Sequence, residues 1–181
     1  MCSSDLTCSA APQPSPGPGQ ILVRVDAASL NYRDLLVARN TYRWSAPLPF
    51  VPASDMAGTV LAVGEGVQRW RGGERVISTF VAGWLDGAAP AASHSLGVPG
   101  PGMLATHVLL DAEWAAPAPA TAPRGMVWSG RASGCAGVAA SGGCTVMRRA
   151  RTSATGAWQA RARPGANASS AGSMLSQPCR A

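Results

Sequence analysis

The amino-acid sequence predicts a mainly β fold: a small, partly open β-barrel with one short helix, followed by a disordered basic tail. Short apolar runs separated by Gly/Pro turns between residues 20 and 116 are typical of such a barrel. Ile, Leu, Val and Phe make up 26 of the 97 residues in that region, but only four of the 61 residues from 121 to 181. The second fraction lies well below the roughly 20% that a chain needs to bury a core, so only the first region is expected to fold.

Local patterns place five regular elements in the foldable region. Strands are expected at residues 21–28, 55–63, 75–80 and 104–110, and a helix at residues 31–39. The first strand alternates apolar and charged residues in its second half, as a half-buried strand does. Asn31 suits the helix N-cap, because its side chain can accept a first-turn N–H, and Asp34 brings a favourable negative charge to that turn. Gly58 in the second strand predicts a bulge or a close approach of two backbones.

The remaining segments are expected to be irregular. Residues 41–52 and 83–102 are expected to be loops, and residues 1–10 supply no strand, so the barrel is expected to lack an edge strand. His107 alternates with apolar neighbours in the last strand, which predicts a position on the barrel surface rather than a role as a base. From Ala115 the composition becomes linker-like, and no helical or strand period follows.

Three motifs follow one another in the foldable region. Residues 28–35 read A-S-L-N-Y-R-D-L, residues 55–67 read D-M-A-G-T-V-L-A-V-G-E-G-V, and residues 73–76 read G-E-R-V. This order resembles the N-terminal, GroES-like domain of the medium-chain dehydrogenase/reductase superfamily, in particular its zinc-independent branch of quinone reductases and related alcohol dehydrogenases. The resemblance implies a GroES-like domain at residues 17–116, between an irregular segment at residues 1–16 and a low-complexity tail at residues 117–181.

The resemblance also implies a site. In the zinc-free relatives, polar residues that match Asn31, Asp34, Tyr42 and Ser54 face the cleft where nicotinamide and substrate meet. The Tyr42 hydroxyl would donate a hydrogen bond to a carbonyl oxygen as that oxygen gains negative charge, and Asn31 would orient ribose or substrate. The alternative is that Asn31 only caps the helix and Tyr42 only packs in its loop, and both interpretations stay open at this stage.

The ligand chemistry argues against a catalytic zinc. Zinc-using relatives place a cysteine where Asn31 stands and a histidine where Ser54 stands, and neither residue here can supply a thiolate or an imidazole. All five cysteines lie outside the foldable region, none with C-x-x-C spacing, and their odd number argues against a disulfide framework. The sequence therefore predicts a protein without zinc.

The family uses NAD(P)H, but a nucleotide site is not evident. Holding a pyrophosphate takes a strand, a Gly-rich turn and a helix N-terminus. The one formal match, residues 100–105 with the sequence G-P-G-M-L-A, follows a loop and precedes a strand. We therefore expect a truncated NAD(P)-dependent oxidoreductase that keeps the substrate-side domain, lacks the nucleotide-binding domain and is inactive alone. Its relatives would act on a carbonyl compound, a quinone or an alcohol.

The tail supports a second interpretation. Residues 1–120 hold seven Arg and nine acids, whereas residues 121–181 hold eight Arg and no acid. A non-enzymatic barrel whose Arg-rich tail binds nucleic acid or another acidic partner is the alternative, although only Trp128 and Trp158 interleave with these arginines. GC-rich DNA read out of frame would also give this composition, which predicts a frameshift or an incorrect gene end near residues 115–125.

The expected cellular location rests on two features of the sequence. Its start has no apolar signal core, and the uncharged run at residues 87–110 is broken by three prolines. A cytoplasmic protein with no membrane contact is expected. The identity of the substrate, the choice between NADH and NADPH, and the oligomeric state are left open.

Overall fold

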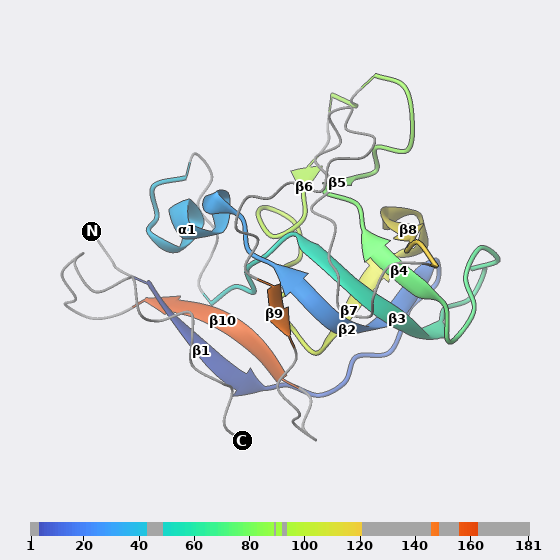
Figure 1. Cartoon of the computed structure of the whole chain (residues 1–181), viewed down its shortest axis with the longest axis horizontal. Helices are drawn as coiled ribbons and strands as arrows, with labels where there is room; N and C mark the ends of the chain where they lie inside the picture. Colours follow the sequence, from blue (N-terminus) through green and yellow to red (C-terminus); the bar gives the residue numbers. More distant parts are fainter. Residues whose placement is uncertain are drawn as a thin grey trace.

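A computed structural model describes residues 4–42, 49–88, 90–91, 94–120, 146–148 and 156–162. Its largest unit is a six-stranded antiparallel sheet with the order β7-β2-β3-β4-β8 and with β9 beside β2, and one short helix lies beyond the end of β2 (Figure 1). The strands are β1 (Ser4–Ala10), β2 (Gln20–Ser29), β3 (Asp55–Val63), β4 (Arg75–Ser78), β5 (Val81–Ala82), β6 (His94–Ser95), β7 (His107–Asp111), β8 (Ala115–Pro117), β9 (Val146–Arg148) and β10 (Gly156–Ala162). The helices are α1 (Tyr32–Ala38) and the 3-10 turn η1 (Ala112–Trp114).

The main sheet curls toward a barrel. β7 and β8 are its two edge strands in the pairing order, yet only the three residues of η1 separate them in the chain. The edges must therefore meet at this end of the sheet. The Thr79 N–H donates to the Trp114 carbonyl at 2.9 Å, and the Ala112 N–H donates to the Gly19 carbonyl at 2.9 Å. The mainly β, partly open barrel predicted from the sequence is confirmed.

The core fills the inside of the curl. Buried and half-buried positions alternate along β7, so every second residue faces inward. In β2 they alternate only from Val23 to Ala27, and consecutive residues are buried on either side of that stretch. Trp70 closes one side, and its indole N–H donates to the Ala112 carbonyl at 2.7 Å. Burial of one large aliphatic side chain stabilises the fold by roughly 1.5–3 kcal/mol. The largest fully buried apolar side chains are Ile21, Val23, Met56, Val60, Val76, Leu96, Met103 and Leu110.

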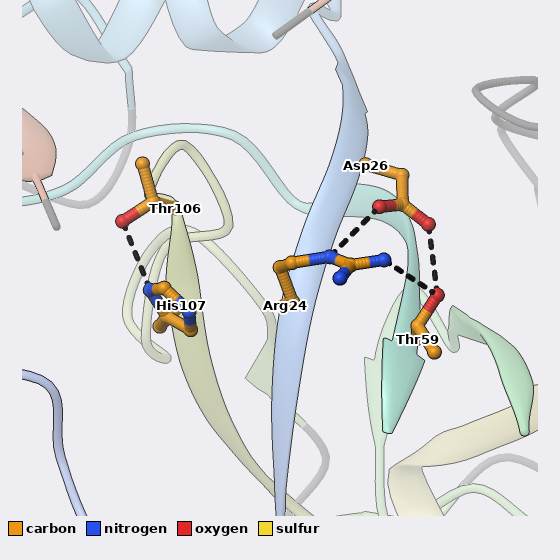
Figure 2. Close-up of polar contacts among 5 residues, drawn as sticks. All are labelled: Arg24, Asp26, Thr59, Thr106 and His107. Carbon is orange, nitrogen blue, oxygen red and sulfur yellow. Dashed lines mark hydrogen bonds and ion pairs between the residues drawn. The ribbon is translucent and has the colours of Figure 1, made fainter. Parts of the chain in front are cut away.

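The outer face of the sheet carries a polar row (Figure 2). Arg24 on β2 is flanked by His107 on β7 and Thr59 on β3. The Arg24 Nε lies 3.3 Å from Asp26 Oδ1, and the Thr59 hydroxyl donates to Asp26 Oδ2 at 3.0 Å. His107 is half-buried here and lies 3.1 Å from the Thr106 hydroxyl, so the structure places it on the barrel surface as predicted.

Gly58 lies at a close approach of β2 and β3. A Cβ atom there would lie 2.4 Å from the Arg24 carbonyl oxygen and 2.5 Å from Val23 Cγ1. The pairing of β2 with β3 also shifts register between Leu22 and Val23 and between Val25 and Ala27. Both features expected of a glycine inside this strand, the close approach and the irregular pairing, are therefore present.

The expectation that residues 1–10 form no strand is wrong. β1 pairs with β10 in a separate two-stranded sheet, from Ser4 opposite Ala162 to Ala10 opposite Gly156. Within residues 121–181, for which disorder is expected, the structure describes β10 and β9, and β9 pairs with β2 at residues 27–29. Strand pairing uses backbone N–H and C=O groups, so an extended segment can join an open strand edge without an apolar pattern of its own. Residues 121–145, 149–155 and 163–181 lie outside the described residues.

Three smaller features also differ from expectation. Residues 115–117, expected as linker, form β8 and pair with β4, and the expected loop at residues 83–102 contains β6, which pairs with β5. Such short strands are defined by distant partners and leave little local signal. Cys8 forms a disulfide, which the odd cysteine count did not predict. The five main elements expected from the sequence are present, with bounds that differ by at most three residues.

None of the helices in the described part of the chain is long and apolar enough to cross a membrane.

We expect Gly58→Ala to lower the free energy of unfolding by about 1–3 kcal/mol, because the new methyl group would overlap the Arg24 carbonyl and force the strands apart. Urea unfolding measures the change. Gly72→Ala is the matched control, since a Cβ there would meet only the Leu61 carbonyl at an ordinary 3.5 Å. Equal stability of the two variants would contradict the close approach.

Candidate active site

The register of β2 and β3 assembles a polar cluster at the end of the barrel. Ser29, the last residue of β2, pairs with Asp55, the first residue of β3. The chain leaving β2 therefore brings Asn31 beside Ser54 and Asp55, and α1 begins directly after Asn31. Two of the three family motifs thus meet at one place.

Asn31 is the centre of this cluster. Its backbone N–H donates to Asp34 Oδ2 at 2.7 Å, and its carbonyl accepts the Asp34 N–H at 2.9 Å, so it occupies the N-cap of α1 as predicted. Its side chain also takes part in the capping box with Asp34, and the amide nitrogen points toward the start of β3. The Nδ2 group donates to Asp55 Oδ2 at 2.5 Å and lies 3.4 Å from the Ser54 hydroxyl. Capping and site contact, posed as alternatives from the sequence, are both made by this residue.

The segment that receives the Asn31 amide is buried and fixed. Ser54 and Asp55 are 0% and 2% exposed. The Ser78 hydroxyl donates to the Ser54 carbonyl at 3.1 Å and accepts the Met56 N–H at 3.0 Å, which ties both ends of this pair of residues to β4.

Ala53, just before this segment, has a left-handed backbone with φ of 68°. That conformation costs a non-glycine residue about 1 kcal/mol or more and persists only where neighbours enforce it. Here the Ala53 carbonyl accepts the Met103 N–H at 2.9 Å, and its N–H donates to the Asp34 carboxylate. Asp34 thus holds both the start of α1 and the approach to β3.

Arg33 connects α1 to the turn after β6. Its Nη1 donates to the Ser95 hydroxyl at 2.5 Å and lies 3.5 Å from the Val98 carbonyl, while Nη2 donates to the Leu96 carbonyl. The guanidinium is therefore committed to this turn. Its Nε is buried and has no hydrogen-bond partner.

Tyr42 joins the cluster through Arg33. The guanidinium carbon of Arg33 lies 5.9 Å from the centre of the Tyr42 ring and 4.8 Å from that of the Phe80 ring, within the range of cation–π attraction. The structure therefore brings Asn31, Asp34 and Ser54 into one hydrogen-bonded cluster and places Tyr42 beside it.

Sequence reasoning missed Arg33 and Asp55 as members of the site. Both lie inside the family motifs, Arg33 between Asn31 and Asp34 and Asp55 directly after Ser54. Their adjacency to the expected site residues was the available signal.

Two carboxyl groups, Asp55 buried and Asp34 half-buried, give the cluster its electrostatic character. Burial raises the pKa of Asp34, against the opposing effects of the Asn31 N–H, the Arg33 charge and the Ala53 N–H. Burial also raises the pKa of Asp55, where the hydrogen bond from Asn31 opposes the shift and the Asp34 charge adds to it. Neither carboxyl forms an ion pair within the part of the chain that the structure describes. Asp55 Oδ1 is buried with no hydrogen-bond partner.

The donor set does not fit a catalytic zinc. An amide and a hydroxyl occupy the positions of Asn31 and Ser54, and zinc in proteins takes Cys, His or carboxylate ligands. Within the described ranges, no group of three or more His, Cys, Asp or Glu residues is placed to hold a metal ion. The prediction that the protein carries no zinc remains a prediction.

The Gly-rich turn at residues 100–102 does not fit a nucleotide pyrophosphate. A Cβ atom on Gly100 would lie 2.8 Å from the Ser95 carbonyl oxygen, and one on Gly102 would lie 1.7 Å from the Val51 carbonyl oxygen. These glycines therefore allow the chain to pack against its own backbone rather than against a phosphate.

A curled antiparallel sheet with a polar cluster between its second strand and a short helix defines a GroES-like barrel of the medium-chain dehydrogenase/reductase type. The chain belongs to the alcohol dehydrogenase GroES-like domain family, which residues 17–120 match. The resemblance of the three motifs to the GroES-like domain of the medium-chain dehydrogenase/reductase superfamily is confirmed.

Relatives from several organisms agree with this assignment. A zinc-type alcohol dehydrogenase-like protein of Schizosaccharomyces pombe is 44% identical over 79 residues, which cover 43% of this chain and 23% of that protein. A quinone oxidoreductase of Rattus norvegicus is 35% identical over 80 residues, covering 43% of this chain and 24% of that protein. The chain thus spans about a quarter of the length of these relatives.

Solved structures share the fold. A crystal structure assigned to the alcohol dehydrogenases, from Sinorhizobium meliloti 1021, is 46% identical with a TM-score of 0.60, covering 63% of this chain and 35% of that one. The structure of an NAD-dependent alcohol dehydrogenase is 29% identical with a TM-score of 0.59, covering 65% of this chain and 36% of that one.

The buried carboxyls predict how stability depends on pH. Because Asp55 holds its proton more tightly when folded, its contribution to stability is fully present below the ordinary carboxyl pKa of 3.8 and is lost as the pH rises through the raised folded-state value. Asp55→Asn carries no such proton, so its free energy of unfolding should gain on that of the wild type as the pH rises above 3.8 and through the raised folded-state pKa.

Urea unfolding across this range measures the difference, and Asp86→Asn, at an exposed acid, is the control. A difference between Asp55→Asn and the wild type that does not change with pH would refute the assignment.

Proposed function

We propose that this chain supplies the substrate-side domain of a zinc-independent, NAD(P)H-dependent oxidoreductase that acts on a quinone, an enone, an aldehyde or an alcohol. The observation that carries the proposal is the cluster of Asn31, Ser54 and Asp55, which brings two family motifs together at the end of the barrel. The names of the relatives, alcohol dehydrogenase and quinone oxidoreductase, support the same substrate classes.

The chain's own residues would bind and orient the substrate. The Tyr42 hydroxyl would donate to the carbonyl oxygen where negative charge develops, since a donor aimed at developing charge stabilises a transition state more than a ground state. Asn31 would fix the position of a substrate or cofactor hydroxyl. In such enzymes the nicotinamide cofactor supplies or accepts the hydride.

We further propose that the chain alone does not hold the nucleotide. The glycines at residues 100–102 pack against backbone, and residues 121–181 hold only four Ile, Leu, Val or Phe side chains in 61 residues. A βαβ unit covered by so few apolar residues would not be stable. Hydride transfer would then require a nucleotide-binding domain that this chain does not provide, and a reading-frame change near residues 115–125 would explain the tail.

We expect acetophenone and 1-phenylethanol to shift the backbone amide resonances of Asn31, Ser54 and Tyr42 in the 15N-labelled chain. The shifts should not change between about 50 mM and 200 mM salt, because neutral ligands release no counterions. NADPH should bind more weakly than about 1 μM, since that affinity needs about 8 kcal/mol, much of it from pyrophosphate contacts.

Shifts of other residues only, together with steeply salt-dependent binding of a polyanion such as heparin, would contradict the proposal. That outcome would favour the alternative, in which eight arginines without an acid at residues 121–181 bind an acidic partner. Micromolar NADPH affinity would show that the tail folds into a nucleotide site.

A further inference from the structure

The nitrogen of the Asn31 side-chain amide has two hydrogen-bond partners within the protein. An amide nitrogen carries two hydrogens, and here it has two partners, Asp55 Oδ2 at 2.5 Å and the Ser54 hydroxyl at 3.4 Å. The donors of this side chain are therefore used within the protein. The side-chain oxygen Oδ1 takes part in the capping box of α1, where the Asn31 side chain accepts from the Asp34 N–H. An amide oxygen has two acceptor positions, so what Asn31 can offer to a bound molecule is the second of them.

We propose that Asp55 is a positioning residue that sets the orientation of the Asn31 amide, so that the site presents a hydrogen-bond acceptor at Asn31 and selects a ligand hydroxyl there. The inference rests on the proposed function and deepens it. A hydroxyl of an alcohol substrate and a ribose hydroxyl of a nucleotide share this chemistry, whereas a ketone or quinone oxygen lacks the required proton.

The contact with Asp55 explains why the Asn31 amide directs its nitrogen, and not its oxygen, toward Asp55. While Asp55 is ionised, reversing the amide would bring Asn31 Oδ1 against Asp55 Oδ2 at the present 2.5 Å separation, with two acceptor oxygens facing each other. It would also leave the amide N–H groups without these partners, and a buried polar group without a partner costs more than a hydrogen bond returns. Asp55 therefore favours one amide orientation over the other.

Asp55 suits this role because its place in the sheet prevents it from moving with the Asn31 side chain. It is 2% exposed, it is the first residue of β3, and it pairs with Ser29 across the sheet. The next N–H along the chain, that of Met56, is held by the Ser78 hydroxyl at 3.0 Å. The carboxyl is thus attached to the rigid sheet rather than to a loop.

Asp34 provides an internal comparison. It is a second, half-buried acid beside the same asparagine, but its carboxyl accepts from the Asn31 backbone N–H at 2.7 Å and not from the side-chain amide. Loss of either carboxyl should lower stability. Only loss of Asp55 should release the amide.

The first test measures the NMR signal of the Asn31 side-chain amide and requires no enzymatic activity. The chain has three asparagines, Asn31, Asn40 and Asn167, so 15N-asparagine labelling gives three side-chain NH₂ signals, and Asn31→Ala assigns one of them. In Asp55→Ser the Asn31 signal should move toward the position of a solvated amide, whereas in Asp34→Ser it should stay. An unmoved signal in a folded Asp55→Ser chain would overturn the proposal.

Asp55→Asn is the second variant, in case Asp55→Ser does not fold. Its amide oxygen can still accept from Asn31, so the Asn31 signal should be retained. A folded Asp55→Asn chain in which the Asn31 signal moves to the solvated position would also overturn the proposal.

The second test compares two ligands of matched shape. 1-Phenylethanol should bind the wild-type chain roughly threefold to tenfold more tightly than acetophenone, the ratio that one net hydrogen bond gives. Asp55→Ser should bring this ratio close to one, and Asp34→Ser should preserve it. Nicotinamide riboside tests the ribose as the source of the hydroxyl, and its preferential binding at Asn31 would assign the contact to the cofactor.

Equal or tighter binding of the ketone by the wild type would overturn the predicted selectivity. If none of the three ligands binds near Asn31, the proposed function fails, while the amide signals still decide whether Asp55 orients Asn31. The two failures are therefore distinguishable.

Discussion

The pairing of Ser29 with Asp55 is the constraint from which the rest of the site follows. It joins the end of β2 to the start of β3, and each strand delivers one polar segment to the same place. A one-residue slip of a strand would send alternate side chains to the opposite face of the sheet. The bulges in β2 and the close approach at Gly58 oppose such a slip, because only one register accommodates them.

The site concentrates unfavourable features that the surrounding structure must offset. Two acids with raised pKa values, a left-handed alanine and an unpartnered carboxyl oxygen lie within a few residues of one another. Their combined cost is offset by the apolar core beneath and by hydrogen bonds from Ser78 and Met103. Strain and buried charge of this kind tend to mark functional sites, which supports the position of the site independently of the family.

Arg33 has a structural role that its charge alone would not suggest. Beside two acids, an arginine would be expected to form ion pairs, but this guanidinium donates to the turn at residues 95–98 and stacks near two aromatic rings. The acids therefore keep their raised pKa values. The same contacts link Tyr42 and this turn to α1.

The sequence predicted what depends on local pattern and missed what depends on distant partners. Strands β2 and β3, helix α1 and the N-cap at Asn31 were predicted, because alternation, capping chemistry and Gly58 are readable in the chain itself. β1, β8 and β10 were missed because their partners lie far away in the sequence, and backbone pairing leaves no side-chain period.

The candidate site divides in the same way. Asn31, Asp34 and Ser54 followed from the resemblance, and they share one hydrogen-bonded cluster. The importance of Asp55 depends on which atom of Asn31 it contacts, and Arg33 on contacts more than sixty residues away. Local patterns in the sequence do not reveal such contacts between distant residues.

The central claim is that the site is part of the rigid sheet rather than a loop attached to it. Native-state hydrogen exchange tests this most directly. The account predicts that the Asn31, Ala53 and Met56 amides, each bonded to a side chain, exchange nearly as slowly as the Val60 amide within the barrel. Exchange of these three amides at the fast rate of the exposed Leu85 would contradict the account.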